Sequence, residues 1–138
     1  MSKTEQTLSI IKPDAVERNL DNEIKEMFKK NTFKHVKFLT GNFDITLPQV
    51  FNNNTYDFIY FKGSCENKTT LNYFESSLSS IHNNSVLLFE NIHSNKESEK
   101  VWNSIKKHEK VTVTIDTFLW GLVFFRKEQE KEHFIIRI

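Results

Sequence analysis

Short apolar runs and longer amphipathic stretches alternate along this chain. Tyr56–Phe61 and Ser85–Phe89 are apolar runs that flank a segment with apolar residues at helical spacing. Runs this short and this apolar suit strands that are buried on both faces, and the segment between them is long enough for a crossover helix. The pattern predicts a βαβ unit of a parallel sheet. In such sheets ligands bind beyond the carboxyl ends of the strands, here Lys62–Glu66 and Glu90–His93.

The rest of the pattern extends this unit into an α/β fold. Further strands are predicted at Gln6–Ile11, Val36–Leu39, Val111–Phe125 (bent near Gly121) and His133–Ile138, and helices at 13–30, around Pro48–Phe51, at Lys68–Ile81 and at Glu97–Lys107. Alternating strands and helices predict one three-layer Rossmann-like sandwich. Right-handed crossovers give a mostly parallel sheet of about six strands in the order 2-1-3-4-6-5. The short loop before the last strand predicts an antiparallel C-terminal hairpin.

Composition narrows the class of protein. The chain has 138 residues, 38% of them hydrophobic, which is enough for one domain with a core. A net charge of +1, with both signs interspersed, argues against nucleic acid or a membrane surface as a partner. Cys65 is the single cysteine, so neither an internal disulfide nor a cysteine-based zinc site is expected. No signal peptide or membrane span is recognisable, and a cytoplasmic protein is expected.

The polar residues that follow two of the predicted strands can each be interpreted in two ways. The turn Lys12-Pro13 lacks glycine and one backbone N–H, which disfavours a dinucleotide-type phosphate loop. Lys12 either meets an anion as a point charge or is simply exposed. Gly41-Asn42-Phe43-Asp44 either holds a purine by stacking and edge hydrogen bonds or forms a turn with Phe43 in the core and Asp44 as a cap.

His93 is the candidate catalytic side chain of the later strand ends. As a general base or nucleophile it needs an orienting partner, for which Glu90 and Glu97 are available. The alternative is a histidine at a helix start with no catalytic role. Lys62–Glu66 contains no pair of ligands suited to a divalent metal, and no metal is expected. Both tryptophans are read as packing residues.

From about Lys25 onward the chain carries a series of familiar segments. They read VKFLTGNFDITLPQVF, YDFIYFKG, TLNYFE, SVLLFENIH, SEKVWNSIK and VTVTIDTFLWGLVFFRKEQEKEHFIIRI. In this order they resemble class I S-adenosylmethionine-dependent methyltransferases of a bacterial kind. The resemblance implies a truncated methyltransferase fold, S-adenosylmethionine as cofactor and a small-molecule substrate. The cofactor-binding positions that it implies are Gly41, Asn42, Phe43, Lys62 and Gly63.

The chain departs from this family at its site positions. The family begins with a strand that ends in a glycine-rich loop for the methionine part of the cofactor, and its second strand ends in an acidic residue for the ribose; the chain has neither. Lys62 occupies a position where members of the family have an acidic residue, as in their segment F-D-G-N-H. Glu90–His93 occupies the position of their segment D-D-I-H. Core positions match and site positions do not, which implies a weakly active or inactive methyltransferase-like protein.

The N-terminal run TLSIIKPDAVERN, Thr7–Asn19, is very similar to the first strand and helix start of nucleoside diphosphate kinases. There the lysine of IKPDAV meets nucleotide phosphates, which implies that role for Lys12. Residues 1–24 are then a kinase-like piece built into a single domain of residues 1–138. This resemblance keeps phosphotransfer through Lys12 and His93 as an alternative, although no arginine lies between Arg18 and Arg126. A third reading is a non-catalytic interaction module, forming a homodimer through the final hairpin or a sheet edge.

Overall fold

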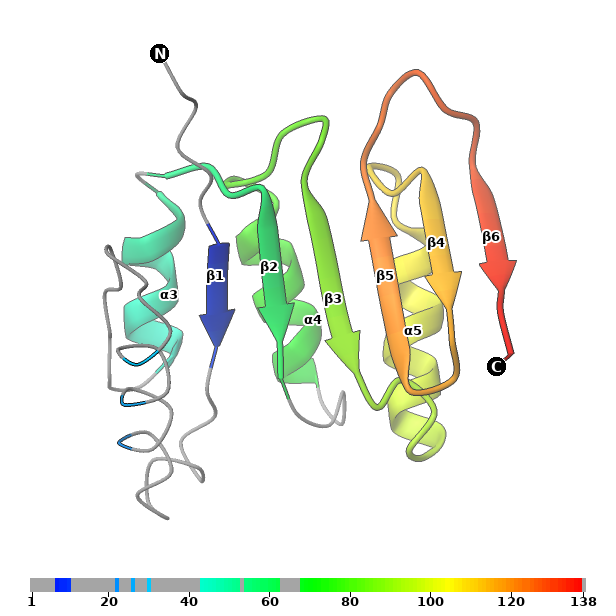
Figure 1. The fold of residues 1–138 in the computed structure, drawn as a ribbon, viewed down its shortest axis with the longest axis horizontal. Coiled ribbons are helices and arrows are strands. Elements are labelled where there is room, and N and C mark those ends of the chain that lie inside the picture. Colours follow the sequence, from blue (N-terminus) through cyan, green and yellow to red (C-terminus); the bar gives the residue numbers. More distant parts are fainter. Residues whose placement is uncertain are drawn as a thin grey trace.

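The computed structural model describes residues 7–10, 22, 26, 30, 43–52, 54–62 and 68–137. Figure 1 shows the fold. The strands are β1 (Thr7–Ile10), β2 (Phe58–Phe61), β3 (Val86–Glu90), β4 (Val113–Asp116), β5 (Trp120–Phe124) and β6 (Glu132–Ile135), and the helices are α3 (Phe43–Phe51), α4 (Lys68–Ser77) and α5 (Lys96–Lys107). The predicted alternation of strands and helices is confirmed over these residues.

The strands form one mixed sheet in the order β1-β2-β3-β5-β4-β6 (Figure 1). β1, β2 and β3 are parallel neighbours, and β2 and β3 are the two strands of the predicted βαβ unit. β5 lies between β3 and β4 and runs antiparallel to both. β6 is parallel to β4. Every described strand except β5 therefore ends at the same edge of the sheet, the lower one in Figure 1.

The predicted strand order is wrong in the C-terminal half. The segment 111–125, expected as one bent strand, forms the two strands β4 and β5, so the antiparallel hairpin lies inside this segment. β6 runs opposite to β5, as the short connecting loop requires, but β4 separates them. The predicted strand Val36–Leu39 lies outside the described residues.

The placement of these strands follows from their side chains. β5 carries the uninterrupted apolar triplet Leu122–Phe124, all of it at least half-buried, which suits an interior strand. β6 is exposed at all of its residues, including Glu132 and His133. A strand whose residues are all largely exposed gains least from a central position, and β6 lies at the edge of the described sheet.

Two helices differ from their predicted bounds. α4 ends at Ser77 and not at Ile81, because a run of serines competes for backbone carbonyls at its end. Ser76 Oγ donates to the Asn72 carbonyl at 2.8 Å, and Ser77 Oγ donates to the Phe74 carbonyl at 2.6 Å. α3 begins earlier than the expected helix around Pro48–Phe51, and it contains Pro48 in its interior.

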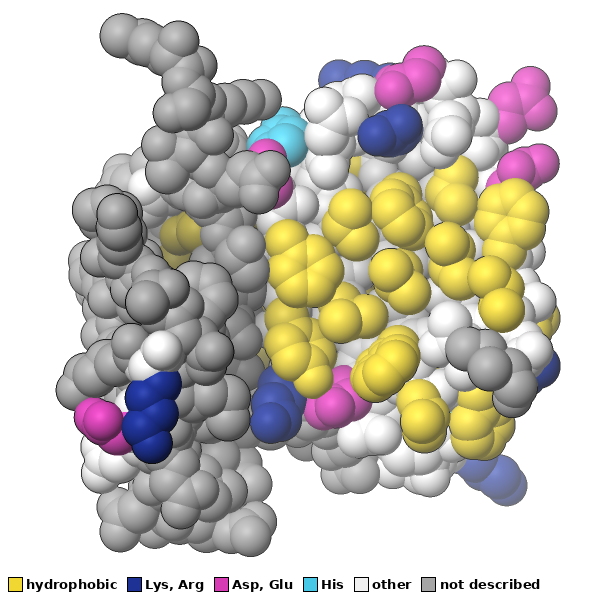
Figure 2. Space-filling view, in the orientation of Figure 1, with side chains coloured by type: hydrophobic (Ala, Val, Ile, Leu, Met, Phe, Trp, Pro, Cys, Tyr) yellow, Lys and Arg dark blue, Asp and Glu magenta, His cyan; other side chains and the backbone are white. Residues whose placement is uncertain are grey.

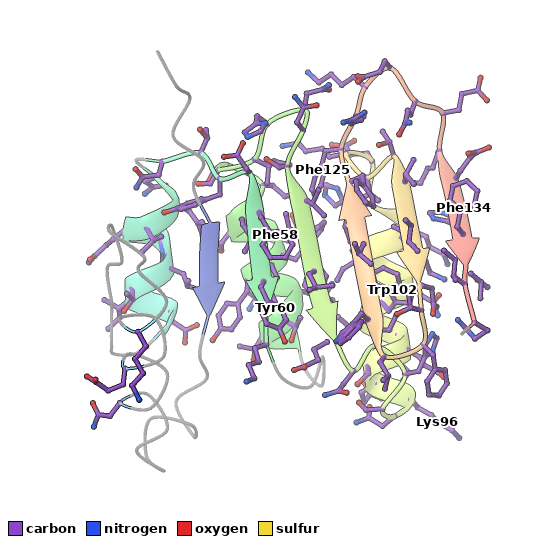
Figure 3. The ribbon with its side chains drawn as sticks, in the orientation of Figure 1. Phe58, Tyr60, Lys96, Trp102, Phe125 and Phe134 are labelled. Carbon is purple, nitrogen blue, oxygen red and sulfur yellow. The ribbon has the colours of Figure 1, made fainter. Side chains whose placement is uncertain are left out.

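α5 is the helix that the sequence specifies most fully. The Asn95 side chain caps it, because Oδ1 accepts the backbone N–H groups of Glu97 and Ser98, both at 2.9 Å. Acidic side chains lie in its first turn and lysines in its last, as the helix dipole favours. Its apolar face buries Trp102, which is fully enclosed behind β5 (Figure 3).

The helices α3, α4 and α5 pack against one face of the sheet and enclose the core. Along β2, Ile59 and Phe61 point into this core, while Phe58 and Tyr60 point to the opposite side and are only half-buried. Within the described ranges that opposite face carries no complete helix, so the predicted third layer is not seen there. In these ranges no helix is long and apolar enough to cross a membrane.

Candidate functional site

Polar side chains gather at the edge where the strands other than β5 end. Lys62 follows β2, Glu90 ends β3 and leads to His93, Asp116 ends β4, and Arg137 follows β6. They share this edge because these strands run parallel to one another. This carboxyl edge is the candidate site.

A buried carboxylate, that of Asp116, organises one half of the site. His93 Nε2 lies 2.6 Å from Asp116 Oδ2, and the Trp102 indole N–H donates to the same oxygen at 3.3 Å. The other oxygen, Oδ1, accepts the backbone N–H of Phe118 at 2.9 Å and the Arg137 guanidinium at 3.1 Å. The Asp116 side chain is only 6% exposed. Four donors on two oxygens leave this carboxylate saturated.

The surroundings of Asp116 decide its charge. Burial alone would raise the pKa of the carboxyl group, but the hydrogen bonds from His93, the Phe118 backbone and Arg137 outweigh it and hold the pKa below its usual value. The carboxyl group is therefore ionised at neutral pH. An ionised carboxylate only accepts hydrogen bonds, so it fixes the orientation of the imidazole through Nε2.

The His93 ring is fixed on its other sides as well. Nδ1 faces Glu99 Oε1 at 3.4 Å, and the Phe118 ring stacks on the imidazole with centroids 5.4 Å apart and planes 17° apart. The Arg137 guanidinium lies 5.7 Å from the centroid of the Phe118 ring. The imidazole is 20% exposed, so Nδ1 is the nitrogen through which it could meet a ligand.

Local backbone conformations bring these groups together. Asn91 has φ 57°, a left-handed conformation that asparagine tolerates better than most residues, and its N–H donates to the Leu119 carbonyl at 2.6 Å. Phe118 has φ 76°, which is strained for an aromatic residue. Its N–H bond to Asp116 and its stacking on His93 hold it there.

A second hydrogen-bonded pair of side chains links β2 and β3 near the carboxyl edge. The Tyr60 hydroxyl donates to Glu90 Oε1 at 3.0 Å (Tyr60 is labelled in Figure 3). Burial, followed by the hydrogen bond to Glu90 and the charge of that carboxylate, raises the pKa of Tyr60 to about 12. The phenol stays neutral at physiological pH and remains a donor to Glu90.

The structure places only part of the predicted site. His93 lies at the edge as expected, but its partners are Asp116 and Glu99 and not Glu90 or Glu97. Glu97 instead pairs with Lys100 at 2.6 Å.

The structure describes only two of the five predicted cofactor-binding residues. Lys62 is exposed after β2, and Phe43 begins α3. Lys12, Gly41, Asn42 and Gly63 lie outside the described residues. Among the residues described, no group of histidine, cysteine and acidic side chains is arranged to hold a metal ion.

Sequence reasoning missed Asp116, Phe118 and Arg137. Asp116 had a visible signal, because it is the only charged residue in the apolar segment Val111–Phe125. A lone carboxylate between apolar residues of a strand is expected to have a buried partner. Trp120, read as a packing residue, is 49% exposed, whereas Trp102 is fully buried.

Comparison with solved structures finds a methyltransferase fold. The chain is similar to the crystal structure of the SAH-bound Podospora anserina methyltransferase PaMTH1, with a TM-score of 0.63 and 13% sequence identity over 90% of this chain. The match covers 62% of the length of PaMTH1. The methyltransferase-like part of the sequence resemblance is confirmed at the level of the fold.

Comparison with protein families identifies the N-terminal half. The family model for nucleoside diphosphate kinase matches residues 5–74, which include Lys12 and end before His93. Curated protein sequences give no significant match. The kinase-like part of the resemblance is thus confirmed, over a longer segment than the motif Thr7–Asn19 alone. Since the matched segment is half of the 138 residues, the chain belongs to the nucleoside diphosphate kinase family, combined with a methyltransferase-like fold.

Proposed function

We propose that this chain is a methyltransferase-like protein that binds S-adenosylmethionine weakly and is weakly active or inactive as a methyltransferase. The observation that carries the proposal is the likeness to an SAH-bound methyltransferase over 90% of the chain. An α/β sheet whose strands mostly run in one direction receives its ligand at the carboxyl edge of those strands. The proposed contacts are Gly41, Asn42 and Phe43 on the adenine side, and Lys62 and Gly63 after β2.

The weakness follows from the polar groups at the edge. The Glu90 carboxylate accepts the Tyr60 hydroxyl, and the ring nitrogens of His93 face Asp116 and Glu99. A ligand can bind Glu90 or His93 only by displacing these hydrogen-bond partners; otherwise it binds without contacts to these two side chains. The sequence also lacks the glycine-rich loop and the ribose carboxylate. Each lost hydrogen bond to a charged or buried group costs about 1–3 kcal/mol of binding free energy, so the affinity for the cofactor falls by several orders of magnitude.

Lys62 adds a preference between the two forms of the cofactor. S-adenosylmethionine carries a positive sulfonium, whereas S-adenosylhomocysteine has a neutral thioether. The exposed ammonium group of Lys62 stands at the strand end where the methyltransferases that the sequence resembles show an acidic residue. Repulsion between like charges disfavours the sulfonium form, so the product should bind better than the cofactor.

Isothermal calorimetry with both compounds tests this function. We expect dissociation constants above about 100 µM, with S-adenosylhomocysteine the tighter of the two. Lys62→Asp should reverse that preference. The matched control is Lys110→Asp, which makes the same charge change shortly before β4, at the opposite edge of the sheet. Low-micromolar binding of S-adenosylmethionine to the unaltered protein would overturn the proposal.

Phosphotransfer from a nucleoside triphosphate is the second candidate, favoured by family membership and by the fixed imidazole of His93. In this reaction Nδ1 would attack the γ-phosphorus, the bond to the bridging oxygen would break and the diphosphate would leave. The absence of arginine between Arg18 and Arg126 weighs against it, because neutralising the transferring phosphoryl group is most of the catalysis.

Incubation with γ-labelled ATP and Mg²⁺ tests the second candidate. Phosphotransfer predicts an acid-labile, alkali-stable label that His93→Ala abolishes. The matched control is His82→Ala, because His82 also bonds a carboxylate, Asp57 Oδ1 at 3.1 Å, but lies before β3 at the other edge. If the protein takes up no label, or His82→Ala loses the label equally, phosphotransfer through His93 is ruled out.

A further inference from the structure

The sheet face opposite the helices is a broad apolar surface. We call it the open face and define it by the side chains that alternate with those of the core. The apolar ones are Phe58 and Tyr60 of β2, Val86 and Leu88 of β3, Val113 and Ile115 of β4, Trp120, Leu122 and Phe124 of β5, and Phe134 of β6, and Glu90 and Glu132 lie on the same side where β3 ends and β6 begins. Figure 2 shows hydrophobic side chains gathered over this face, with charged side chains around them.

From this surface we propose that the protein forms a homodimer in which the open faces of two copies stack on one another. Parallel strands are normally covered on both faces, because their side chains are apolar on both. Here β2 and β3 are parallel and apolar on both sides, and the described helices cover only one. A second sheet about 10 Å away would cover the other.

The size of the open face fits a twofold contact. Trp120 is 49% exposed and Phe134 47% exposed, which leaves roughly 100 Å² of each side chain in water. The eight half-buried side chains add roughly 50 Å² each, so the face presents on the order of 600 Å². A dimer would then bury about 1,200 Å² in total, at the lower end of stable interfaces. We therefore expect a dissociation constant in the micromolar range.

A second copy fits this surface better than a charged partner does. The net charge is +1 and both signs occur at the rim, so nothing selects a strongly acidic or basic molecule. A twofold axis through a flat apolar patch pairs the patch with itself and needs no complementary charge. This contact differs from pairing through the sheet edge, because the edge strand β6 would contribute only Phe134.

Two neighbouring residues of β6 give a matched test. Phe134 lies on the open face beside Ile115, while Ile135 lies on the helix side beside Asp116 and is more exposed, at 68%. Sedimentation of the full chain from about 1 to 200 µM should show a monomer–dimer equilibrium. Phe134→Glu should weaken the dimer at least tenfold, and Ile135→Glu should leave it unchanged. A monomer at every concentration, or an equal loss in both variants, would overturn the proposal.

Tryptophan fluorescence supplies a second readout that does not depend on a variant. Trp102 is buried in the monomer, so Trp120 is the tryptophan whose environment would change. Dimerisation should shift the emission to the blue and protect Trp120 from acrylamide as the concentration rises. Protection that is complete at the lowest concentration, in a monomer, would mean that another part of the chain covers the face, and that result also contradicts the proposal.

Discussion

Gly121→Ala tests the closest approach between the sheet and α5. Gly121 lies in β5 directly over the indole of Trp102. An added Cβ would lie 2.6 Å from two carbons of the benzo ring, Cη2 and Cζ3, and 3.0 Å from Cζ2. Carbon atoms in contact are about 3.5–4.0 Å apart, so the ring would have to retreat by about 1 Å. Trp102 is fully buried and cannot swing away.

The cost can be estimated from three contributions. Overpacking of this kind costs about 1–3 kcal/mol. Moving the indole also lengthens the 3.3 Å bond from Nε1 to Asp116 Oδ2, for about 1 kcal/mol more. Alanine restricts the unfolded chain and returns about 0.4–1 kcal/mol. The variant should therefore be less stable by about 2 kcal/mol, which lowers the melting temperature by roughly 6–8 °C.

Thermal and urea denaturation followed by circular dichroism measure this loss. The control is the same change in a Trp102→Phe background, because phenylalanine lacks the benzo ring atoms that meet the new methyl group. In that background Gly121→Ala should cost almost nothing, which gives a coupling energy of about 2 kcal/mol. The reasoning is refuted if Gly121→Ala costs the same in both backgrounds, or if it changes the stability of the unaltered protein by less than about 0.5 kcal/mol.

Three further predictions concern charge and capping. Asp116→Asn should cost about 1.5–3 kcal/mol at pH 7. Because the pKa of this carboxyl group is depressed in the folded state, its contribution to stability is present above the ordinary value of 3.8 and is lost as the pH falls through the folded value. Urea titrations should therefore show a smaller cost near pH 3 than at pH 7. Asn95→Ala should cost about 1 kcal/mol through the lost cap of α5, which an Asn95→Asp control should restore. Burial, followed by the charges of Lys106 and Lys131, lowers the pKa of His133, so the melting temperature should decline as the pH falls below about 6.5. His133→Gln should flatten that decline, and an unchanged slope of melting temperature against pH would contradict the role of His133.

The sequence was sufficient to predict the elements whose burial shows in their pattern. Uniform apolar runs identified β2 and β3 as adjacent strands of a βαβ unit, and helical spacing identified α4 and α5. The hairpin between β4 and β5 was missed because its turn, Thr117–Trp120, contains no glycine, asparagine or aspartate at its centre. The turn depends instead on Asp116, whose side chain accepts the Phe118 N–H.

The candidate site was harder to predict for a related reason. His93 was recognisable from its place after β3, but its partner Asp116 is distant in sequence, on a strand whose order in the sheet was predicted wrongly. Nearby Glu90 and Glu97 were the natural candidates, and each is bonded elsewhere, to Tyr60 and to Lys100. Partners across a sheet depend on strand order, which local patterns do not specify.

Titration with S-adenosylhomocysteine, followed in the NMR spectrum of ¹⁵N-labelled protein, tests the proposed function most directly. The backbone amides of Lys62, Glu90 and His93 report on the carboxyl edge, and those of Lys110 and Lys127 at the opposite edge serve as controls. The account predicts shifts confined to the carboxyl edge that do not saturate below about 100 µM ligand. Saturation at low micromolar concentration, or shifts centred on the opposite edge, would contradict it.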